Sequence, residues 1–394
     1  MRGDLLGDVL GAGGTFRYGF LAAAGWRPCV IGFGGYGSQR EVRVMGRVLM
    51  TEKNLGRVWL NQRRGWRQFF DSQVPSYPVL IKAGDAIRVI EADSGGYIDQ
   101  HITGHGFEPG WRDVRVHLIN RGDWQKHRKR LLEGMDPDHI SASKLAARAQ
   151  SLGVRIDRGI DIPVRIVGDF ETTGIVCDID DTIMVSMVPH KLLALRYMLL
   201  DKVSTRQAVP GMSYFLNRLQ HHLHILEPAH RETEKLPPPF LFLSNGAWNT
   251  IPVLRHFLER GEFPRSTVLL RPWGFSEIGF PTSGPANKLS HLEDLARMLP
   301  QVKWVLVGDN GQRDPEICAE FGRRWPKNLA AVAIRTLLPL EHLTSHGTMK
   351  ELSRLDRANL PEGVPLIFGE DGYHLNRSAS SMEFNRELIA RLQA

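Results

Sequence analysis

The sequence has few cysteines and no long apolar run. Its 394 residues include three cysteines, Cys29, Cys177 and Cys318, which lie far apart and form no CxxC pair. This spacing argues against a disulfide scaffold or a structural zinc site and predicts a reducing compartment, the cytoplasm. No stretch of about 18 apolar residues occurs, so we expect no transmembrane segment. The N-terminus, with Asp4 and Asp8 among many glycines, also lacks the pattern of a secretory signal peptide.

Excess positive charge is confined to the N-terminal part of the chain. Residues 1–150 hold 22 Lys or Arg and 15 Asp or Glu, whereas the remainder holds 28 of each, so this part carries the net charge of +7. We expect such a module to contact an anionic membrane surface peripherally. Nucleic acid is a less favoured partner, because few aromatic residues are interleaved with the basic ones. A solvated basic face without a partner is the alternative. The most basic stretches contain Arg63, Arg64 and Arg67, and Lys126, Arg128, Lys129 and Arg130.

The first part of the chain has the pattern of a small β domain. Between residues 39 and 120, short runs of alternating apolar residues are separated by turns, which is typical of a β-sandwich or barrel. Residues 121–158 are polar and helix-prone, and residues 163–167 read as a last strand. We therefore predict a basic, β-rich domain over 1–170, a small β-sandwich with a helical insertion near 121–158.

Beyond residue 170, continuous apolar runs alternate with amphipathic helix patterns. This alternation predicts an α/β domain over 171–394, with a parallel sheet covered on both faces. The runs fall at 174–177, 240–243, 267–270, 304–307, 330–334 and 364–368. Residues 221–239 interrupt the pattern and read as a surface insertion. Its histidines are expected to be surface residues, since no ligand set has matching spacing; they are His221, His222, His224 and His230.

Acidic residues gather directly after the first apolar run of this second domain. Asp178, Asp180 and Asp181 occupy three of four positions and are followed by Thr182. Such crowded carboxylates repel one another unless a cation offsets their charge. Mg²⁺ suits this arrangement, because it binds through one or two carboxylates and keeps water and substrate phosphate as further ligands. The neighbouring Cys177 is expected to be a core residue, since it would point away from a site that Asp178 faces.

Polar residues also follow later strands, at the edge of a parallel sheet where active sites gather. Ser244, Asn245 and Gly246 offer side-chain and backbone donors to a phosphate oxygen. Lys288, at the start of a predicted helix, can balance acids and phosphate. Two further acids flank a glycine turn, Asp309 and Asp314. Such a pair suits metal coordination by one acid and orientation of the metal ligands by the other.

These motifs resemble the haloacid dehalogenase-like phosphatase superfamily and, within it, the App1-type (DUF2183) phosphatidate phosphatase family. The resemblance implies a Rossmann-like catalytic domain over 171–394, preceded by the β domain, and a Mg²⁺-dependent phosphatase that hydrolyses phosphatidate to diacylglycerol. In two places the chain departs from the pattern: Asn310 stands where the family more often has Ser, and 221–239 is inserted between motifs. The matching motifs are DIDDT at 178–182, LSNGAWN at 243–249, residues 288–299, VGDNGQRDPEI at 307–317 and, more weakly, GFGGYG at 32–37.

The resemblance also implies a role for each motif residue. Asp178 would be the nucleophile and Asp180 the general acid and base. Mg²⁺ would be held by Asp178, Asp180 and Asp309, with Asp314 behind them. The phosphoryl group would be bound by Ser244 and stabilised by Lys288, and the neighbouring phosphate-binding positions are Thr182, Asn245 and Gly246.

Two other functions fit parts of the sequence. The same chemistry could act on a soluble phosphoester or on the phosphate end of a nucleic acid, since anionic lipids and phosphate backbones both attract Lys and Arg. The chain could also be a non-catalytic interaction protein with a degenerate phosphatase domain. The presence of every motif acid argues against this last hypothesis.

Overall fold

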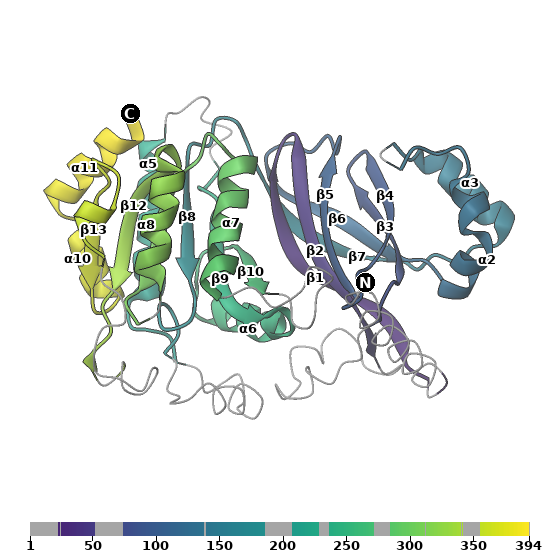
Figure 1. The fold of residues 1–394 in the computed structure, drawn as a ribbon, viewed down its shortest axis with the longest axis horizontal. Coiled ribbons are helices and arrows are strands. Elements are labelled where there is room, and N and C mark those ends of the chain that lie inside the picture. The colour runs from purple at the N-terminus through teal and green to yellow at the C-terminus, as the bar shows by residue number, and fades with distance from the viewer. Residues whose placement is uncertain are drawn as a thin grey trace, which may run out of the picture. The chain divides into compact units, whose positions relative to one another are not determined.

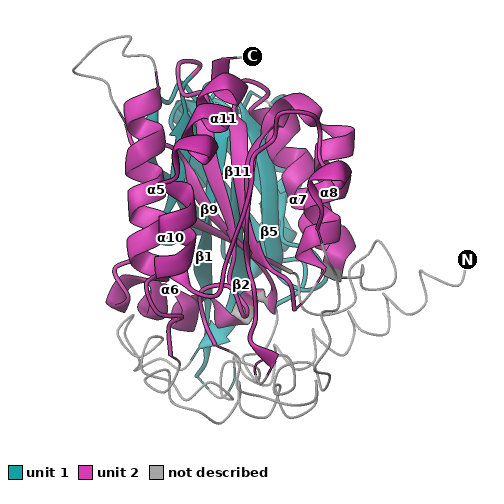
Figure 2. Cartoon of the chain, turned by 90° about the vertical axis from the view of Figure 1, so that its left-hand side faces the viewer, with its two compact units in different colours: residues 1–60, 70–168, 272–281 teal, residues 61–69, 169–271, 282–394 magenta. Residues whose placement is uncertain are grey.

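The computed structural model describes two compact units (Figure 2). Described residues up to Gly168 form unit 1, and those from Asp169 onward form unit 2. Arg63, Arg64, Arg67 and His230, singled out above, lie outside the described residues. The described residues are 23, 25–51, 74–137, 139–185, 207–227, 236–271, 284–311, 313–339, 341 and 355–393.

Unit 1 is built on one mixed sheet of seven strands. Their order in the sheet is β4-β3-β6-β7-β1-β2-β5. Neighbours are antiparallel except for β1 and β7, which pair in parallel. The predicted β-sandwich is not confirmed, because these strands form one continuous hydrogen-bonded order. The strands are β1 (Arg27–Ser38), β2 (Glu41–Thr51), β3 (Pro78–Ala83), β4 (Ala86–Glu91), β5 (Tyr97–Thr103), β6 (Gly110–Leu118) and β7 (Ile160–Val167).

Two helices lie between β6 and β7, within the stretch that reads as helix-prone. They are α2 (Arg121–Leu132) and α3 (Ala142–Leu152). Asn120 caps α2, because its side chain accepts a hydrogen bond from the backbone N–H of Asp123 at 3.1 Å. Trp124 and Leu131 point from α2 into an apolar cluster with Leu145 of α3. A second, larger cluster is formed mainly by β-branched residues of the strands.

Unit 2 contains a six-stranded sheet in which all neighbours are parallel. The predicted parallel α/β sheet is therefore confirmed. The order β10-β9-β8-β11-β12-β13 places the first strand beside the fourth. The strand order thus reverses between β8 and β11, where open α/β sheets bind their ligands. The strands are β8 (Thr173–Asp178), β9 (Phe240–Ala247), β10 (Thr267–Arg271), β11 (Lys303–Asp309), β12 (Leu329–Arg335) and β13 (Leu366–Gly369).

Helices cover both faces of this sheet, with α5 and α10 on one side and α7 and α8 on the other (Figures 1 and 2). The covering is why the strands are apolar up to their carboxyl ends: all seven residues of β12 are buried, and only the last, Arg335, is charged. Within the described residues, no helix is long and apolar enough to cross a membrane. The helices are α5 (Met212–Leu226), α6 (Ile251–Arg260), α7 (Gly284–Met298), α8 (Asp314–Arg324), α10 (Gly372–Ala379) and α11 (Met382–Gln393), with short 3₁₀ turns at Trp248–Thr250, Pro326–Asn328 and Arg357–Asn359.

Candidate active site

Asp178 is the last residue of β8, and a tight turn follows it. Ile183 donates its backbone N–H to Ile179 O at 3.0 Å, and Asp181 donates to Met184 O at 2.9 Å. Asp181 adopts a left-handed conformation, with φ of 61°. The turn ends the strict alternation of side chains along the strand, so that the acids after β8 point in directions which strand geometry alone does not determine.

Lys288 of α7 is paired with two acids in the protein interior. Its Nζ lies 2.5 Å from Asp178 Oδ1 and 2.6 Å from Asp314 Oδ1. Burial by itself would lower the pKa of Lys288, but the two carboxylates outweigh it and raise that pKa above its ordinary value. The ammonium group therefore stays charged and joins the end of β8 to the start of α8.

Asp309, at the end of β11, is fixed by the turn that follows. Its Oδ1 accepts the Gly311 N–H at 2.7 Å, and its own N–H donates to Asp314 Oδ2 at 3.3 Å. Residue 308 must be glycine for Asp314 to approach this closely, because a Cβ there would lie 2.7 Å from Asp314 Oδ2. Both oxygens of Asp314 are thus engaged, one by Lys288 and one by the backbone of Asp309.

The Thr182 hydroxyl lies between Asp178 and Asp309. Its Oγ1 is 3.2 Å from Asp178 Oδ2 and 3.1 Å from Asp309 Oδ2. A hydroxyl carries one proton and can donate to only one of these oxygens at a time. The other contact brings lone pairs together, which a bound cation or a protonated carboxyl would relieve.

The donor set fits a divalent cation. Asp178, Asp309 and Asp314 are buried, and one carboxylate oxygen of each lies within 4.8 Å of the others. With the Lys288 ammonium these groups carry two uncompensated negative charges, which a divalent cation would neutralise. Burial, followed by the repulsion of Asp314, raises the pKa of both Asp178 and Asp309 well above the usual range. Hard cations such as Mg²⁺ bind oxygen ligands of this kind.

Asp180 is not among the three acids whose oxygens lie within 4.8 Å of one another. Its Oδ2 accepts a hydrogen bond from Ser244 Oγ of β9 at 2.7 Å. Ser244 Oγ in turn accepts the Gly246 N–H at 2.8 Å. Between them Asn245 is half-buried, and its buried Oδ1 has no hydrogen-bond partner among the described residues. Ser244, Asn245 and Gly246 therefore lie in the last part of β9, where its pairing with β10 shifts register, and Ser244 contacts Asp180.

The other residues singled out from the sequence lie outside this arrangement. Cys177 is fully buried, and burial raises the pKa of its thiol well above the usual range. Three histidines lie on α5, where His221 is exposed and His222 and His224 are half-buried. Asn310, next to Asp309, accepts the Leu337 N–H through its side-chain Oδ1 at 2.8 Å.

Sequence reasoning missed one buried charge close to the site, Arg335. It ends β12, is 3% exposed and donates from Nη1 to Asp181 O at 2.6 Å. The signal in the sequence was its position: a cationic residue directly after the apolar run 330–334, at the carboxyl end of a strand.

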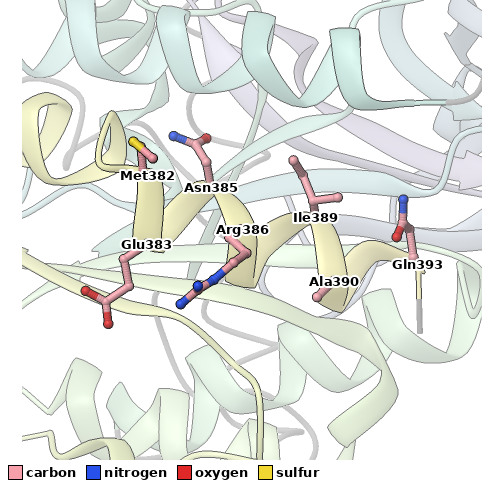
Figure 3. Close-up of a pocket in the computed structure, with 7 residues that line it drawn as sticks. All are labelled: Met382, Glu383, Asn385, Arg386, Ile389, Ala390 and Gln393. Atoms are coloured by element: carbon pink, nitrogen blue, oxygen red, sulfur yellow. The ribbon is translucent and has the colours of Figure 1, made fainter.

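A shallow pocket in unit 2 has no part in this chemistry (Figure 3). All of its described lining residues belong to α11, whose Arg391 donates to Leu329 O at the amino end of β12. The acids lie at the carboxyl ends of the strands. The pocket residues are Met382, Glu383, Asn385, Arg386, Ile389, Ala390 and Gln393.

Comparisons with known proteins match the part of the chain that holds these acids. Residues 173–336 match the family described as phosphatidate phosphatase APP1, catalytic domain. An uncharacterized protein of Schizosaccharomyces pombe is 32% identical over 98 residues, which are 25% of this chain and 16% of that protein. Phosphatidate phosphatase APP1 of Saccharomyces cerevisiae is 27% identical over 99 residues, 24% of this chain and 16% of that protein. The chain thus matches about a sixth of the length of these relatives.

Proposed function

We propose, from the match of residues 173–336 to the App1-type catalytic-domain family, that the protein is a Mg²⁺-dependent phosphatase that hydrolyses a phosphomonoester. The favoured substrate is phosphatidate, which would yield diacylglycerol. The observation that carries the proposal is the buried group of Asp178, Asp309 and Asp314 around Lys288, where the strand order reverses. In this proposal residues 171–394 form a haloacid dehalogenase-type domain, and residues 1–170 form the basic domain before it.

Asp178 and Asp309 would hold the cation, since one oxygen of each already converges on Thr182. Asp314 would support them from behind, because its oxygens are bound to Lys288 and to the backbone of Asp309. The metal role of Asp180 stays a prediction. When bound, Mg²⁺ would neutralise negative charge on the acids and on the substrate phosphate.

Asp178 is the proposed nucleophile. Its carboxylate attacks phosphorus in line, an oxygen–phosphorus bond forms, and the bond to the leaving alkoxide breaks. Lys288 favours the ionised form that the attack requires, since its ammonium lies 2.5 Å from Asp178 Oδ1. The same ammonium can stabilise charge on the transferring group. The product of this step is an aspartyl-phosphate on Asp178.

Asp180 is the proposed general acid and base. It gives its proton to the leaving alkoxide, and then takes a proton from the water that attacks the aspartyl-phosphate. Hydrolysis releases inorganic phosphate and restores both carboxyl groups. Ser244 keeps Asp180 directed toward the phosphate-binding residues of β9 through their 2.7 Å hydrogen bond. Thr182, Asn245 and the Gly246 backbone would bind the phosphoryl oxygens.

The basic helix α2 supports a lipid substrate. Lys126, Arg128, Lys129 and Arg130 are all exposed on this helix. Such residues attract anionic lipid surfaces. We propose peripheral binding to the cytoplasmic face of a membrane, which would bring the catalytic domain to phosphatidate.

The test is phosphate release from a substrate panel, with and without Mg²⁺. The panel contains phosphatidate in vesicles, lysophosphatidate, nucleotides, a 5′-phosphorylated oligonucleotide and sugar phosphates. We expect release from phosphatidate that EDTA abolishes and Mg²⁺ restores. Phosphate release from a soluble member of the panel alone would show that the substrate belongs to that soluble class and is not phosphatidate. No release from any member at any Mg²⁺ concentration would contradict a phosphatase.

A further inference from the structure

The buried guanidinium of Arg335 contacts three separate segments of the chain. It donates from Nη1 to Asp181 O at 2.6 Å, from Nε to Glu370 O at 2.9 Å, and from Nη2 to Glu341 Oε1 at 2.6 Å. In the sheet, Arg335 is the register partner of Asp309. Arg335 thus lies beside one proposed metal ligand and holds the turn that follows another, Asp178.

The carbonyl that Arg335 binds belongs to a residue in an unfavourable backbone conformation. Among the described residues other than glycine, only Ser76, Asp181 and Glu262 have positive φ. The left-handed region is disfavoured for residues with a Cβ, so surrounding contacts must hold Asp181 there. Asp181 stands between Asp180 and Thr182, and the orientation of its peptide groups therefore sets the direction of both neighbouring side chains.

We propose that Arg335 is a positioning residue for phosphoryl transfer, an inference that rests on the proposed function. By fixing the turn at Asp181, its guanidinium keeps the Asp180 carboxylate at Ser244 and the Thr182 hydroxyl between Asp178 and Asp309. Arg335 itself touches none of the reacting groups in this arrangement. A planar guanidinium suits the task, since it can bond three acceptors in fixed directions, whereas an ammonium group cannot reproduce that fork.

Glu341 keeps the guanidinium in place. Its Oε1 pairs with Arg335, and its Oε2 accepts the Leu338 N–H at 2.9 Å. Asn310 adds a second tie, because its N–H donates to Arg335 O at 3.0 Å and its Oδ1 accepts the Leu337 N–H. The segment after β12 is thereby bound to Asn310, the residue that follows Asp309. We call Arg335, Glu341 and Asn310 the clamp, because together they connect the end of β11 with the turn that follows β8.

The experiment compares Arg335→Lys with Arg357→Lys in the full chain. Both substitutions keep the positive charge, and Arg357 is an exposed residue paired with Glu387. Steady-state kinetics with the best substrate of the panel, at saturating Mg²⁺, should show kcat lowered at least about tenfold in Arg335→Lys with KM changed less than about threefold. Arg357→Lys should match the unsubstituted protein. An unchanged kcat in folded Arg335→Lys would overturn the proposal.

Amide hydrogen exchange tests the clamp without relying on turnover. In Arg335→Lys, a peptide covering 179–185 should exchange at least about tenfold faster, whereas one covering 303–307 in β11 should not change. If no substrate is hydrolysed, the proposed function fails, and hydrogen exchange alone then tests whether Arg335 fixes the turn. Unchanged protection of 179–185 in Arg335→Lys would overturn that role. Should Arg335→Lys not fold, Glu341→Gln keeps the guanidinium and removes its counter-charge. This second variant should show both effects more weakly, and their absence would also overturn the proposal.

Discussion

One buried ammonium group joins two acids that follow different strands: Lys288 Nζ lies 2.5 Å from Asp178 Oδ1 and 2.6 Å from Asp314 Oδ1. Each of the three side chains is at most 6% exposed. Lys288 belongs to α7, Asp178 ends β8 and Asp314 begins α8. The proposed nucleophile is therefore held by a contact between elements that are distant in the sequence, and removing the Lys288 ammonium leaves both acids buried without their counter-charge.

Replacing Asp178 with Asn should abolish turnover and preserve the fold. Asn is nearly isosteric but cannot form an acyl-phosphate, so we expect kcat to fall by roughly a thousandfold or more. The measurement is phosphate release at saturating Mg²⁺, with circular dichroism to confirm folding. Asp169→Asn, at an exposed position, is the matched control and should remain active. Activity of Asp178→Asn within about tenfold of the unsubstituted protein would contradict the nucleophile assignment.

Replacing Lys288 with Met should destabilise the protein as well as inactivate it. The substitution leaves Asp178 and Asp314 buried without their counter-charge, a change that typically costs about 3–5 kcal/mol of unfolding free energy. Urea unfolding measures the loss, and Mg²⁺ should recover part of it by replacing the missing positive charge. Lys327→Met removes an exposed lysine and should alter stability by less than about 0.5 kcal/mol. Equal stability of the two variants would show that the ion pairs contribute nothing.

Stability without metal should fall as pH rises. Burial raises the pKa of Asp178 and Asp309 above their values in the unfolded chain. The folded state then binds more protons than the unfolded chain. The contribution of these two groups to stability is therefore fully present below about pH 4 and is lost as pH rises through their folded pKa values. The measurement is the melting temperature in EDTA between about pH 4 and pH 8, for the unsubstituted protein and for Asp178→Asn. The melting temperature of Asp178→Asn should depend less on pH, because one of the two carboxyl groups is absent.

Mg²⁺ should reverse this trend, because it binds the ionised carboxylates. The stabilisation that Mg²⁺ adds should therefore grow with pH over the same range. A shift in melting temperature that is the same at each pH, or is absent, would argue against a cation site formed by these acids.

Neutralising the basic face of α2 should weaken binding to anionic vesicles. The variant replaces four exposed residues with Gln: Lys126, Arg128, Lys129 and Arg130. Each cation near the surface contributes about 1 kcal/mol, so two or three engaged residues strengthen binding by roughly 30-fold to 150-fold. Sedimentation with phosphatidate-containing vesicles measures the change, and salt should weaken binding of the unsubstituted protein.

A charge-matched variant controls for net charge alone. It replaces four exposed residues of unit 2 with Gln: Arg218, Arg260, Lys327 and Arg377. This control should bind vesicles more tightly than the α2 variant, and both should hydrolyse a soluble substrate at the original rate. Binding that is insensitive to salt and to the α2 substitutions would leave this helix as a solvated basic face.

The strands of unit 2 were determined by local sequence. A strand covered on both faces needs apolar residues at every position, so the runs 174–177, 240–243 and 304–307 predict strands without knowledge of their neighbours. They lie in β8, β9 and β11, and their sheet is parallel as expected. Alternation likewise predicts strands in unit 1. It says which face of a strand is buried but not which strand lies beside it, and the parallel pairing of β1 with β7 joins residues far apart in the chain.

The sequence also places acids after β8 and β11, but tertiary structure decided which of them meet. The strand order sets these two strand ends side by side, and Thr182 then contacts both Asp178 and Asp309. Asp180, only two residues from Asp178, turns instead to Ser244 on β9. The physical reason is that side-chain direction beyond a strand depends on the backbone of the turn. Here that turn is held at Asp181 by Arg335, which lies 154 positions further along the chain.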